Sequence, residues 1–292
     1  MKTIIFSRLA MAALVLFSAS AQAAVTCTSV ISSGFSSTRD SLVATDTLNQ
    51  GSFTIVCSRA VNDPTTTVFY AALAKGSANA TASNFRARLG ATSSYLNYNV
   101  YTNSSYSNDW SKNNNCITGS FSVSSSSSNS LPIPYYAKIP ASQNVPPGTY
   151  SDTPLISVNY LTTGAASCPN NGSGNFSGSF QVQITNTASC QIGTPPGTVA
   201  FTYTAFAPAP ATASTTFTIR CANTTPYTMA LDANAGVVSG LNYALTLSAT
   251  SGTGTGIAQG YSINGTMAAG QAGSCASANC TASDRRTLTV TY

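Results

Sequence analysis

The feature that most constrains the fold of this chain is an internal repeat. Two pairs of cysteines are separated by nearly equal lengths of chain, Cys27 with Cys57 and Cys190 with Cys221. The second cysteine of each pair ends a similar run, residues 51–57 and 215–221, with the shared pattern Phe-Thr-Ile-x-Cys. Both halves also end on a run of equal length from Ser-Asp to Tyr, residues 151–160 and 283–292. Self-similarity of this kind indicates two copies of one domain.

Each copy is expected to be all-β. Apolar residues alternate with serine, threonine or other polar residues, a period-two pattern that is typical of half-buried strands. Pro, Gly and Asn clusters separate the runs, and no long helical stripe is present. Short strands at this spacing predict two sandwiches in tandem. The alternating residues are Phe53/Ile55, Ile156/Val158/Tyr160, Phe180/Val182/Ile184, Phe217/Ile219 and Leu288/Val290/Tyr292.

Residues 1–23 have the pattern of a secretory signal peptide. Lys2 and Arg8 precede the apolar run 9–17, and Ala21-Gln22-Ala23 offers a small-residue cleavage site. The alternative is a short core helix. We expect cleavage after Ala23 and export to the bacterial periplasm. The mature chain then divides into an N-terminal domain, 24–187, and a C-terminal domain, 188–292.

Eight cysteines in an exported chain predict four disulfides, because the count is even and the compartment is oxidising. The repeat suggests the pairs Cys27–Cys57 and Cys190–Cys221. Cys275 and Cys280 are close enough for a local bridge, which leaves Cys116 and Cys168 as the remaining pair.

The composition excludes much enzyme chemistry. The chain has 12 Lys+Arg, seven acidic residues that are all Asp, and no His. Without His there is no Ser-His or Cys-His nucleophile and no His metal ligand, so we expect neither an enzyme nor a metal or other cofactor. Removing residues 1–23 leaves ten basic and seven acidic residues, a net charge of +3. This charge is too small and scattered to predict nucleic-acid binding.

The two copies differ at their ends. After Tyr160 the first copy continues through the loop 161–178 into another strand, 179–187, whereas the second copy stops at Tyr292. A sandwich without its last strand exposes core and unpaired backbone groups, unless another chain adds a strand. The alternative is a smaller, complete sandwich. Only three residues precede Cys27 in the mature chain, so we expect a subunit that receives a strand but donates none, at the end of a fibre.

Both halves resemble the spore coat protein U-like domain, and the two-domain form resembles the tip adhesin of archaic, Csu-type chaperone–usher pili. The residues that carry the resemblance are Cys27, 51–57, 139–152 and Tyr160 in the first copy, and Cys190, 217–221, 226–228, 268–271 and 287–292 in the second. The second copy departs from the pattern by lacking Gly-x-Tyr before Ser283 and by inserting Cys275 and Cys280.

This resemblance implies an immunoglobulin-like pilin fold, with the C-terminal copy lacking its last strand. It implies that a periplasmic chaperone, and then an adjacent pilus subunit, completes that copy. It also implies an outer-membrane usher as partner, a location at the pilus tip, and a role in attachment and biofilm formation. The groove for the foreign strand is expected to be lined by Phe217, Ile219, Leu288, Val290 and Tyr292; the alternative is an ordinary closed core.

An antiparallel succession of strands places the loops 58–66, 102–132 and 161–178 at the end of the first copy far from the second. We expect aromatic and aliphatic residues there to contact an abiotic hydrophobic surface or a glycan. The alternative is that they are core residues of a large loop. The candidates are Tyr106, Trp110, Phe121, Val123, Leu131 and Phe176.

Two other classes of function remain open from the sequence. One is a secreted structural protein of a spore or cell coat, and the other is a secreted carbohydrate-binding protein. Arg86 and Arg88 are interpreted as solvated charges on a loop, and Tyr95, Tyr98 and Tyr101 as residues that pack on a strand.

Overall fold

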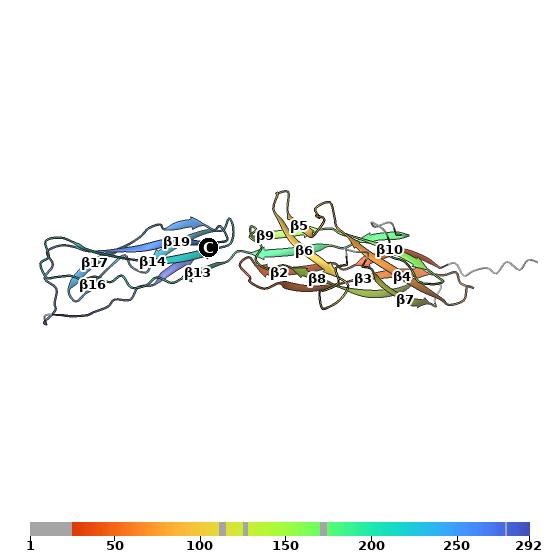
Figure 1. Cartoon of the computed structure of the whole chain (residues 1–292), viewed down its shortest axis with the longest axis horizontal. Coiled ribbons are helices and arrows are strands. Elements are labelled where there is room, and N and C mark those ends of the chain that lie inside the picture. Colours follow the sequence, from red (N-terminus) through yellow and green to blue (C-terminus); the bar gives the residue numbers. More distant parts are fainter. Residues whose placement is uncertain (1–24, 111–114, 125–127, 170–173, 278) are drawn as a thin grey trace, which may run out of the picture.

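The computed structural model describes residues 25–292 apart from 111–114, 125–127, 170–173 and 278. The predicted signal peptide therefore lies outside the described residues. Within these residues all regular structure is strand, which confirms the all-β prediction, and no helix suited to crossing a membrane is present. The strands form two units that lie end to end (Figure 1). We call β1–β12 the N-terminal unit and β13–β20 the C-terminal unit.

The N-terminal unit is a sandwich of an eight-stranded and a four-stranded sheet. The larger sheet has the order β1 (Thr26–Ser32), β3 (Thr47–Ser58), β8 (Asn129–Ile139), β6 (Tyr95–Tyr101), β5 (Phe85–Leu89), β9 (Gly148–Asp152), β12 (Val182–Thr187) and β2 (Phe35–Asp40). The smaller has the order β11 (Phe176–Ser179), β10 (Leu155–Leu161), β4 (Thr66–Lys75) and β7 (Ile117–Val123).

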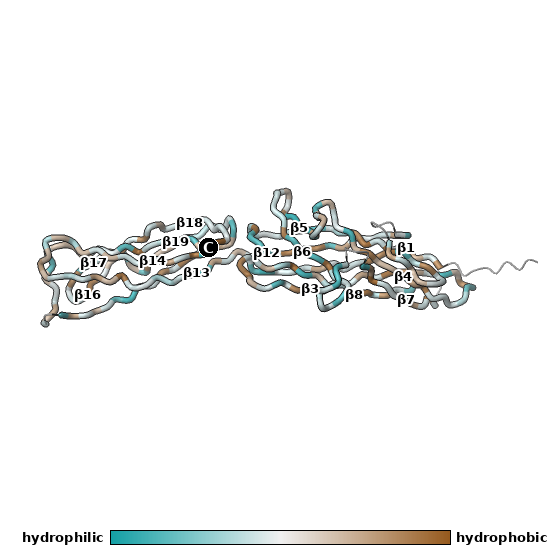
Figure 2. The backbone as a smooth tube through the Cα atoms, in the orientation of Figure 1, coloured by the Kyte–Doolittle hydropathy of each residue, from teal (hydrophilic) through white to brown (hydrophobic). Residues whose placement is uncertain are grey.

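The period-two pattern of the sequence explains this layering. In β3 the apolar residues Phe53 and Ile55 are fully buried, while the residues between them are only partly covered. Burying one such side chain contributes about 1.5–3 kcal/mol, so a register slip by one residue would place the whole set in water. Hydrophobic and hydrophilic residues are interspersed along the strands of both units (Figure 2).

The C-terminal unit is a smaller sandwich of five and three strands. The larger sheet has the order β13 (Cys190–Thr194), β14 (Ala211–Cys221), β19 (Ala258–Met267), β17 (Leu241–Leu247) and β16 (Ala235–Val238). The smaller has the order β18 (Ser251–Thr253), β15 (Pro226–Leu231) and β20 (Leu288–Thr291). Each unit has its own cluster of buried apolar residues.

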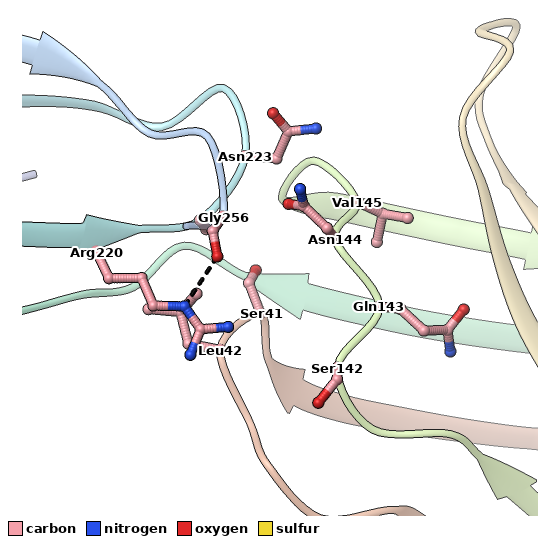
Figure 3. A pocket seen from close by; sticks show the side chains of 10 residues that line it. Ser41, Leu42, Ser142, Gln143, Asn144, Val145, Arg220, Asn223 and Gly256 are labelled. Atoms are coloured by element: carbon pink, nitrogen blue, oxygen red, sulfur yellow. Dashed lines mark hydrogen bonds between the residues drawn. The ribbon is translucent and has the colours of Figure 1, made fainter. Parts of the chain in front are cut away.

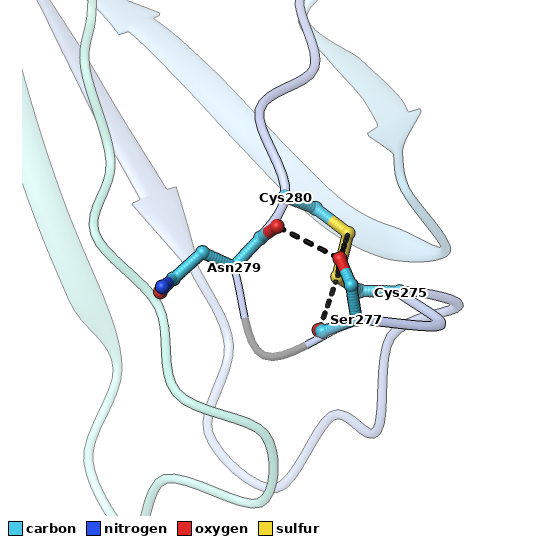
Figure 4. The surroundings of a disulfide bond; sticks show 4 residues. All are labelled: Cys275, Ser277, Asn279 and Cys280. Atoms are coloured by element: carbon cyan, nitrogen blue, oxygen red, sulfur yellow. Dashed lines mark hydrogen bonds between the residues drawn. A yellow bond between two sulfur atoms is a disulfide. The ribbon is translucent and has the colours of Figure 1, made fainter.

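The disulfides agree with the pairs that the sequence predicts. Cys27–Cys57 joins β1 to β3 and Cys190–Cys221 joins β13 to β14, both as directly opposed residues with Cα atoms 4.0 Å apart. Cys116–Cys168 and the local bridge Cys275–Cys280 complete the set (Figure 4). The two bridges in matching positions show that the repeat in the sequence is a repeat in space.

Short polar contacts join the units at their junction. Ser189 Oγ donates to Asp40 Oδ1 at 2.5 Å, and Asn144 Nδ2 donates to the carbonyl of Thr255 at 2.9 Å. Asn144 and Gly256 face each other across a small pocket (Figure 3). A Cβ at Gly256 would lie 1.9 Å from Asn144 Oδ1, and its φ of +77° favours glycine. A side chain at this position would therefore have to displace the Asn144 side chain, which donates the hydrogen bond to Thr255.

Candidate functional site

The candidate site is an unpaired strand edge in the C-terminal unit. β20 is the last strand of its sheet and pairs only with β15, from Leu288 opposite Leu231 to Thr291 opposite Thr228. Its counterpart in the N-terminal unit is β10, which pairs with β4 on one side and with β11 on the other. β20 therefore presents the backbone groups that β10 uses to bind β11.

The larger sheet of the C-terminal unit has fewer strands than the larger sheet of the N-terminal unit, five against eight. Its order β13–β14–β19–β17–β16 matches β1–β3–β8–β6–β5 of the N-terminal unit. The next three strands of the N-terminal sheet, β9, β12 and β2, have no counterpart strands. Residues 195–210 and the described part of 268–287, which hold the positions of β2 and β9 in the sequence, lie in no strand.

One hydrogen bond occurs in both units and shows what the missing strands change. Tyr98 on β6 donates to Asp152 Oδ2 at 2.7 Å, and Tyr243 on β17 donates to Asp284 Oδ2 at 2.5 Å. Asp152 is buried, because Val182 of β12 pairs directly with it. The Asp284 side chain is 29% exposed. The same contact thus lies inside the complete unit and at the surface of the incomplete one.

The surroundings of the two tyrosines follow from this difference. Burial, followed by the charge of Asp152, raises the pKa of Tyr98 well above its ordinary value. Burial and the hydrogen bond to Asp284 also raise the pKa of Tyr243. In the C-terminal unit Arg286 joins the pair, with Nη2 2.5 Å from Asp284 Oδ2 and Nε donating to Tyr243 Oη at 2.8 Å. Arg286 therefore lies beside Asp284, whereas the matching Asp152 of the N-terminal unit has β12 beside it.

Half-buried apolar residues line the region beside the open edge. Leu288 and Val290 on β20 are partly covered, and so are Val199, Phe201 and Tyr203 in the segment before β14. The segment packs on Gly265 of β19, where a Cβ would lie 2.4 Å from Phe201 Cζ and 2.7 Å from Val199 Cγ1. Apolar side chains that the N-terminal unit would bury under β12 are thus left half-exposed.

Four of the five residues predicted for this groove belong to one apolar cluster. Phe217 and Ile219 are buried in the centre of this cluster, and Leu288 and Val290 form its partly covered rim. Tyr292 lies outside the cluster and is 59% exposed. Sequence reasoning missed Val199, Phe201 and Tyr203, although their period-two spacing was a usable signal.

The strand that completes the N-terminal unit shows what would fit this edge. The β11–β12 segment contributes Phe180, Val182 and Ile184, each of which is at most 1% exposed. β12 runs antiparallel to β9 and parallel to β2. A strand with alternating large apolar residues, placed between β20 and the segment 199–203, would supply the equivalent packing.

The residues predicted for an adhesive tip are not gathered on one surface, and two of them are corrected. Trp110 is fully buried: it stacks on Phe53 at 5.3 Å between ring centroids, and its Nε1 donates to the carbonyl of Ala72 at 2.8 Å. Val123 is also fully buried. Contacts with Phe53 of the larger sheet and Ala72 of the smaller one thus place the Trp110 side chain between the two sheets.

The other four candidates are half-buried. Tyr106 lies on the outer face of the larger sheet, with its ring 6.0 Å from that of Tyr136. Phe121, Leu131 and Phe176 are on strands and pack against the core. The expected loop 102–132 is instead interrupted by β7 and by the start of β8.

The bridge Cys116–Cys168 also lies elsewhere than expected. Cys116 precedes Ile117, which pairs with Ala72 in the middle of β4. Asn159 on β10 donates to the carbonyl of Ser167, so the loop that carries Cys168 folds back along the sheet. The disulfide therefore braces the side of the sandwich, not its tip. At the far end, Val61 in the loop after β3 is 77% exposed.

The described residues contain no cluster of His, Cys, Asp or Glu that could hold a metal ion. None of the curated proteins compared with the chain matches it. Solved structures that resemble it include the tip adhesion subunit in the CsuC–CsuE pre-assembly complex of archaic Csu pili from Acinetobacter baumannii, with 17% identity, a TM-score of 0.44, and coverage of 90% of this chain and 100% of that chain. Another is the CupB6 tip adhesin of Pseudomonas aeruginosa, with 10% identity, a TM-score of 0.42, and coverage of 91% and 94%.

The sequence itself was compared with models of protein families. The model of the Spore Coat Protein U domain matches residues 13–157 and 176–263, which include strands of both units. The match covers well over half of the sequence and confirms the resemblance found from the cysteines and strand patterns. The chain therefore belongs to the Spore Coat Protein U domain family.

Proposed function

We propose that this protein is the tip subunit, or adhesin, of an archaic chaperone–usher pilus. The observation that carries the proposal is the open edge of β20, set against the closed edge of its counterpart β10. A periplasmic chaperone would first supply a strand to this edge. The adjacent pilus subunit would then replace it at the outer-membrane usher. Such strand addition uses main-chain hydrogen bonds for affinity and alternate side chains for specificity.

The division of labour follows the two units. Residues 1–23 direct export, residues 24–187 form a self-complete adhesive domain, and residues 188–292 form the domain that a donor strand completes. The N-terminal unit has its own closing strand, β12, so it needs no partner to bury its core. The protein would act at the cell surface, at the tip of the pilus, in attachment and biofilm formation. Its role is binding and assembly rather than catalysis.

The adhesive contact is assigned to the loops at the far end of the N-terminal unit. Val61 is the most exposed large apolar residue there, and Leu161 at the end of β10 is 46% exposed. Trp110 and Val123 have no part in it, since both are buried. In this assignment the exposed apolar side chains would be removed from water on contact with an abiotic hydrophobic surface or the apolar face of a glycan.

A strand-addition experiment tests the assignment of the C-terminal unit. The probe is a peptide copy of residues 176–187, the segment that closes the N-terminal unit. The C-terminal unit, expressed alone in an oxidising periplasm, should be unstable without the peptide and should gain a cooperative melting transition with it. The N-terminal unit should melt cooperatively without any addition.

The matched control is the same peptide with Phe180, Val182 and Ile184 changed to serine. It keeps the backbone but removes the apolar side chains, and it should not stabilise the C-terminal unit. If the C-terminal unit folds fully unaided, the edge needs no partner, and a stand-alone coat protein becomes the better explanation.

A further inference from the structure

The outer face of the larger N-terminal sheet carries an unusual set of side chains. Tyrosines and basic residues from β5, β6, β8 and the loop after β6 lie on it together, all of them partly exposed. We call this surface the Tyr–Arg face and define it as Arg86, Arg88, Tyr95, Tyr106, Tyr136 and Lys138. It lies on the side of the sheet away from the core and apart from both the β20 edge and the far-end loops.

The strand register makes this face continuous. Arg88 pairs with Tyr95, and Arg86 pairs with Asn97, across β5 and β6. Asn99 pairs with Lys138, and Tyr101 pairs with Tyr136, across β6 and β8. Paired residues of neighbouring strands point to the same side of a sheet. The face therefore runs across three adjacent strands without a break.

Two arginines share one tyrosine ring on this face. The guanidinium carbon of Arg86 lies 4.3 Å from the centroid of the Tyr95 ring, and that of Arg88 lies 5.9 Å from it. Both arginines are on β5, two residues apart, so their Cα atoms are separated by about 7 Å. They are strand residues and not the loop charges that the sequence suggested.

The positive charge of this pair is not neutralised within the described part of the chain. Arg86 Nε donates to the carbonyl of Asn79, and Arg88 donates to the carbonyls of Thr92 and Ala91. These partners are neutral, and neither arginine forms an ion pair with a described carboxylate. The guanidinium groups are held in place yet keep donors free, since each carries five N–H groups.

The contacts that described carboxylate residues make with this face lie at its other end. Asp46 lies 3.8 Å from Lys138 Nζ, and Asp109 lies opposite Tyr101 in an isolated bridge. The net positive field is thus concentrated at Arg86 and Arg88. Towards Lys138 the face becomes aromatic, with the ring of Tyr106 between those of Tyr101 and Tyr136 at 5.8 and 6.0 Å.

We propose that the Tyr–Arg face binds an acidic polysaccharide, with a uronate carboxylate held by Arg86 and Arg88 and neighbouring sugar rings resting on Tyr106 and Tyr136. Guanidinium groups bind carboxylates through charge-assisted, often bidentate, hydrogen bonds. Tyrosine offers an apolar ring face together with a hydroxyl that can hydrogen-bond to sugar. The charge complementarity and the continuity of the face across three strands both favour an extended acidic chain.

This proposal goes beyond the pilus assignment, because it concerns a different surface and does not need the β20 edge. A nucleic acid is a poorer partner for this face. Double-stranded DNA carries one charge per about 1.7 Å of its length, and its binding depends on many phosphate contacts. The face offers two unpaired cations close together, which matches one carboxylate better than a row of phosphates.

Binding of the full chain to immobilised polygalacturonate tests the proposal. The variant R86Q/R88Q should bind at least about tenfold more weakly, because two charge-assisted contacts are lost. The matched control K75Q/R285Q removes the same charge from other elements and should bind within about twofold of wild type. Methyl-esterified polygalacturonate, which keeps the sugar but not the charge, should bind weakly to every form.

Three outcomes would overturn the proposal. They are equal binding by R86Q/R88Q and wild type, equal binding of the esterified polymer, and double-stranded DNA binding as tightly as polygalacturonate with the same loss in R86Q/R88Q. Near-UV circular dichroism and melting temperature check that each variant is folded. If R86Q/R88Q does not fold, Y136S on the neighbouring strand tests the same face, with a loss of at least about threefold expected from one lost ring contact.

Discussion

The two units of this protein share their disulfide, their core strand order and a Tyr–Asp hydrogen bond, yet only one of them is closed. In the N-terminal unit β12 covers Asp152 and completes the sheet. In the C-terminal unit the matching Asp284 is at the surface and β20 has an open edge. The comparison teaches that five core strands of the repeated domain pair in the same order, with or without strands at the positions of β9, β12 and β2. The sheets still form, but the apolar rim remains uncovered.

The largest effect is expected from a substitution in β12, the strand that closes the N-terminal unit. Ile184→Asp would place a carboxylate without a partner in the core, at a cost above about 4 kcal/mol, so the N-terminal unit should not fold. Val290→Asp, on the half-buried edge strand β20 of the other unit, should abolish stabilisation of the C-terminal unit by the 176–187 peptide. Urea unfolding of the N-terminal unit and peptide titration of the C-terminal unit are the two measurements. A folded Ile184→Asp unit, or peptide stabilisation that survives Val290→Asp, would contradict the difference between the units.

The next largest effect compares a buried residue, Trp110, with an exposed residue of the proposed adhesive loops, Val61. Trp110→Ala should destabilise the N-terminal unit by about 3–5 kcal/mol, because it leaves a cavity and removes the hydrogen bond to the Ala72 carbonyl. Val61→Ser should change stability by less than about 0.5 kcal/mol while reducing attachment of piliated cells to plastic. Chemical denaturation and an attachment assay give the two readouts. If Trp110→Ala keeps its stability but loses attachment, Trp110 belongs to the adhesive surface and this prediction is wrong.

A smaller effect compares the two Tyr–Asp pairs. Tyr98→Phe leaves Asp152 Oδ2 buried without its donor and should cost about 1–3 kcal/mol. Tyr243→Phe should cost less than about 1 kcal/mol, because Asp284 is exposed and keeps Arg286. Denaturation midpoints of both variants are the measurement. If the costs are equal, burial by β12 does not distinguish the pairs.

The smallest effect is a dependence on alkaline pH. Burial raises the pKa of Tyr98 well above its ordinary value of 10 and that of Tyr150 to about 12. A tyrosine with a raised folded-state pKa contributes stability that is fully present below pH 10 and is lost as the pH rises through the folded value. The N-terminal unit should therefore lose stability between pH 10 and 12. Tyr150→Phe should reduce the slope, and an unchanged slope would show that Tyr150 does not titrate in this range.

Much of the fold could be predicted from local patterns. Period-two runs such as Phe217/Ile219 and Leu288/Val290 predicted strands, because alternation is the only way for a strand to bury one face. The cysteine spacings and the repeat predicted all four disulfides. Each of these signals needs only neighbouring residues or a comparison of the two halves.

The positions of single side chains were less accessible. The sequence suggested that Trp110 and Val123 are exposed loop residues, but both side chains are fully buried in the core. Arg86 and Arg88 looked like loop charges, yet they belong to a short strand and lie beside Tyr95 only because β5 and β6 pair in one register. Sequence spacing does not report which segments of a chain lie opposite one another.

The sequence by itself determined that this protein is all-β, with an internal repeat and four disulfide pairs. Alternation, cysteine spacing and repetition are local properties, and they survive in any arrangement of the strands. The tertiary structure alone decided which apolar residues fill the core, where the exposed ones remain, and how the Tyr–Arg face is assembled. The physical reason is that burial and contact between distant residues depend on how sheets pair and pack, and packing is shared by the whole molecule.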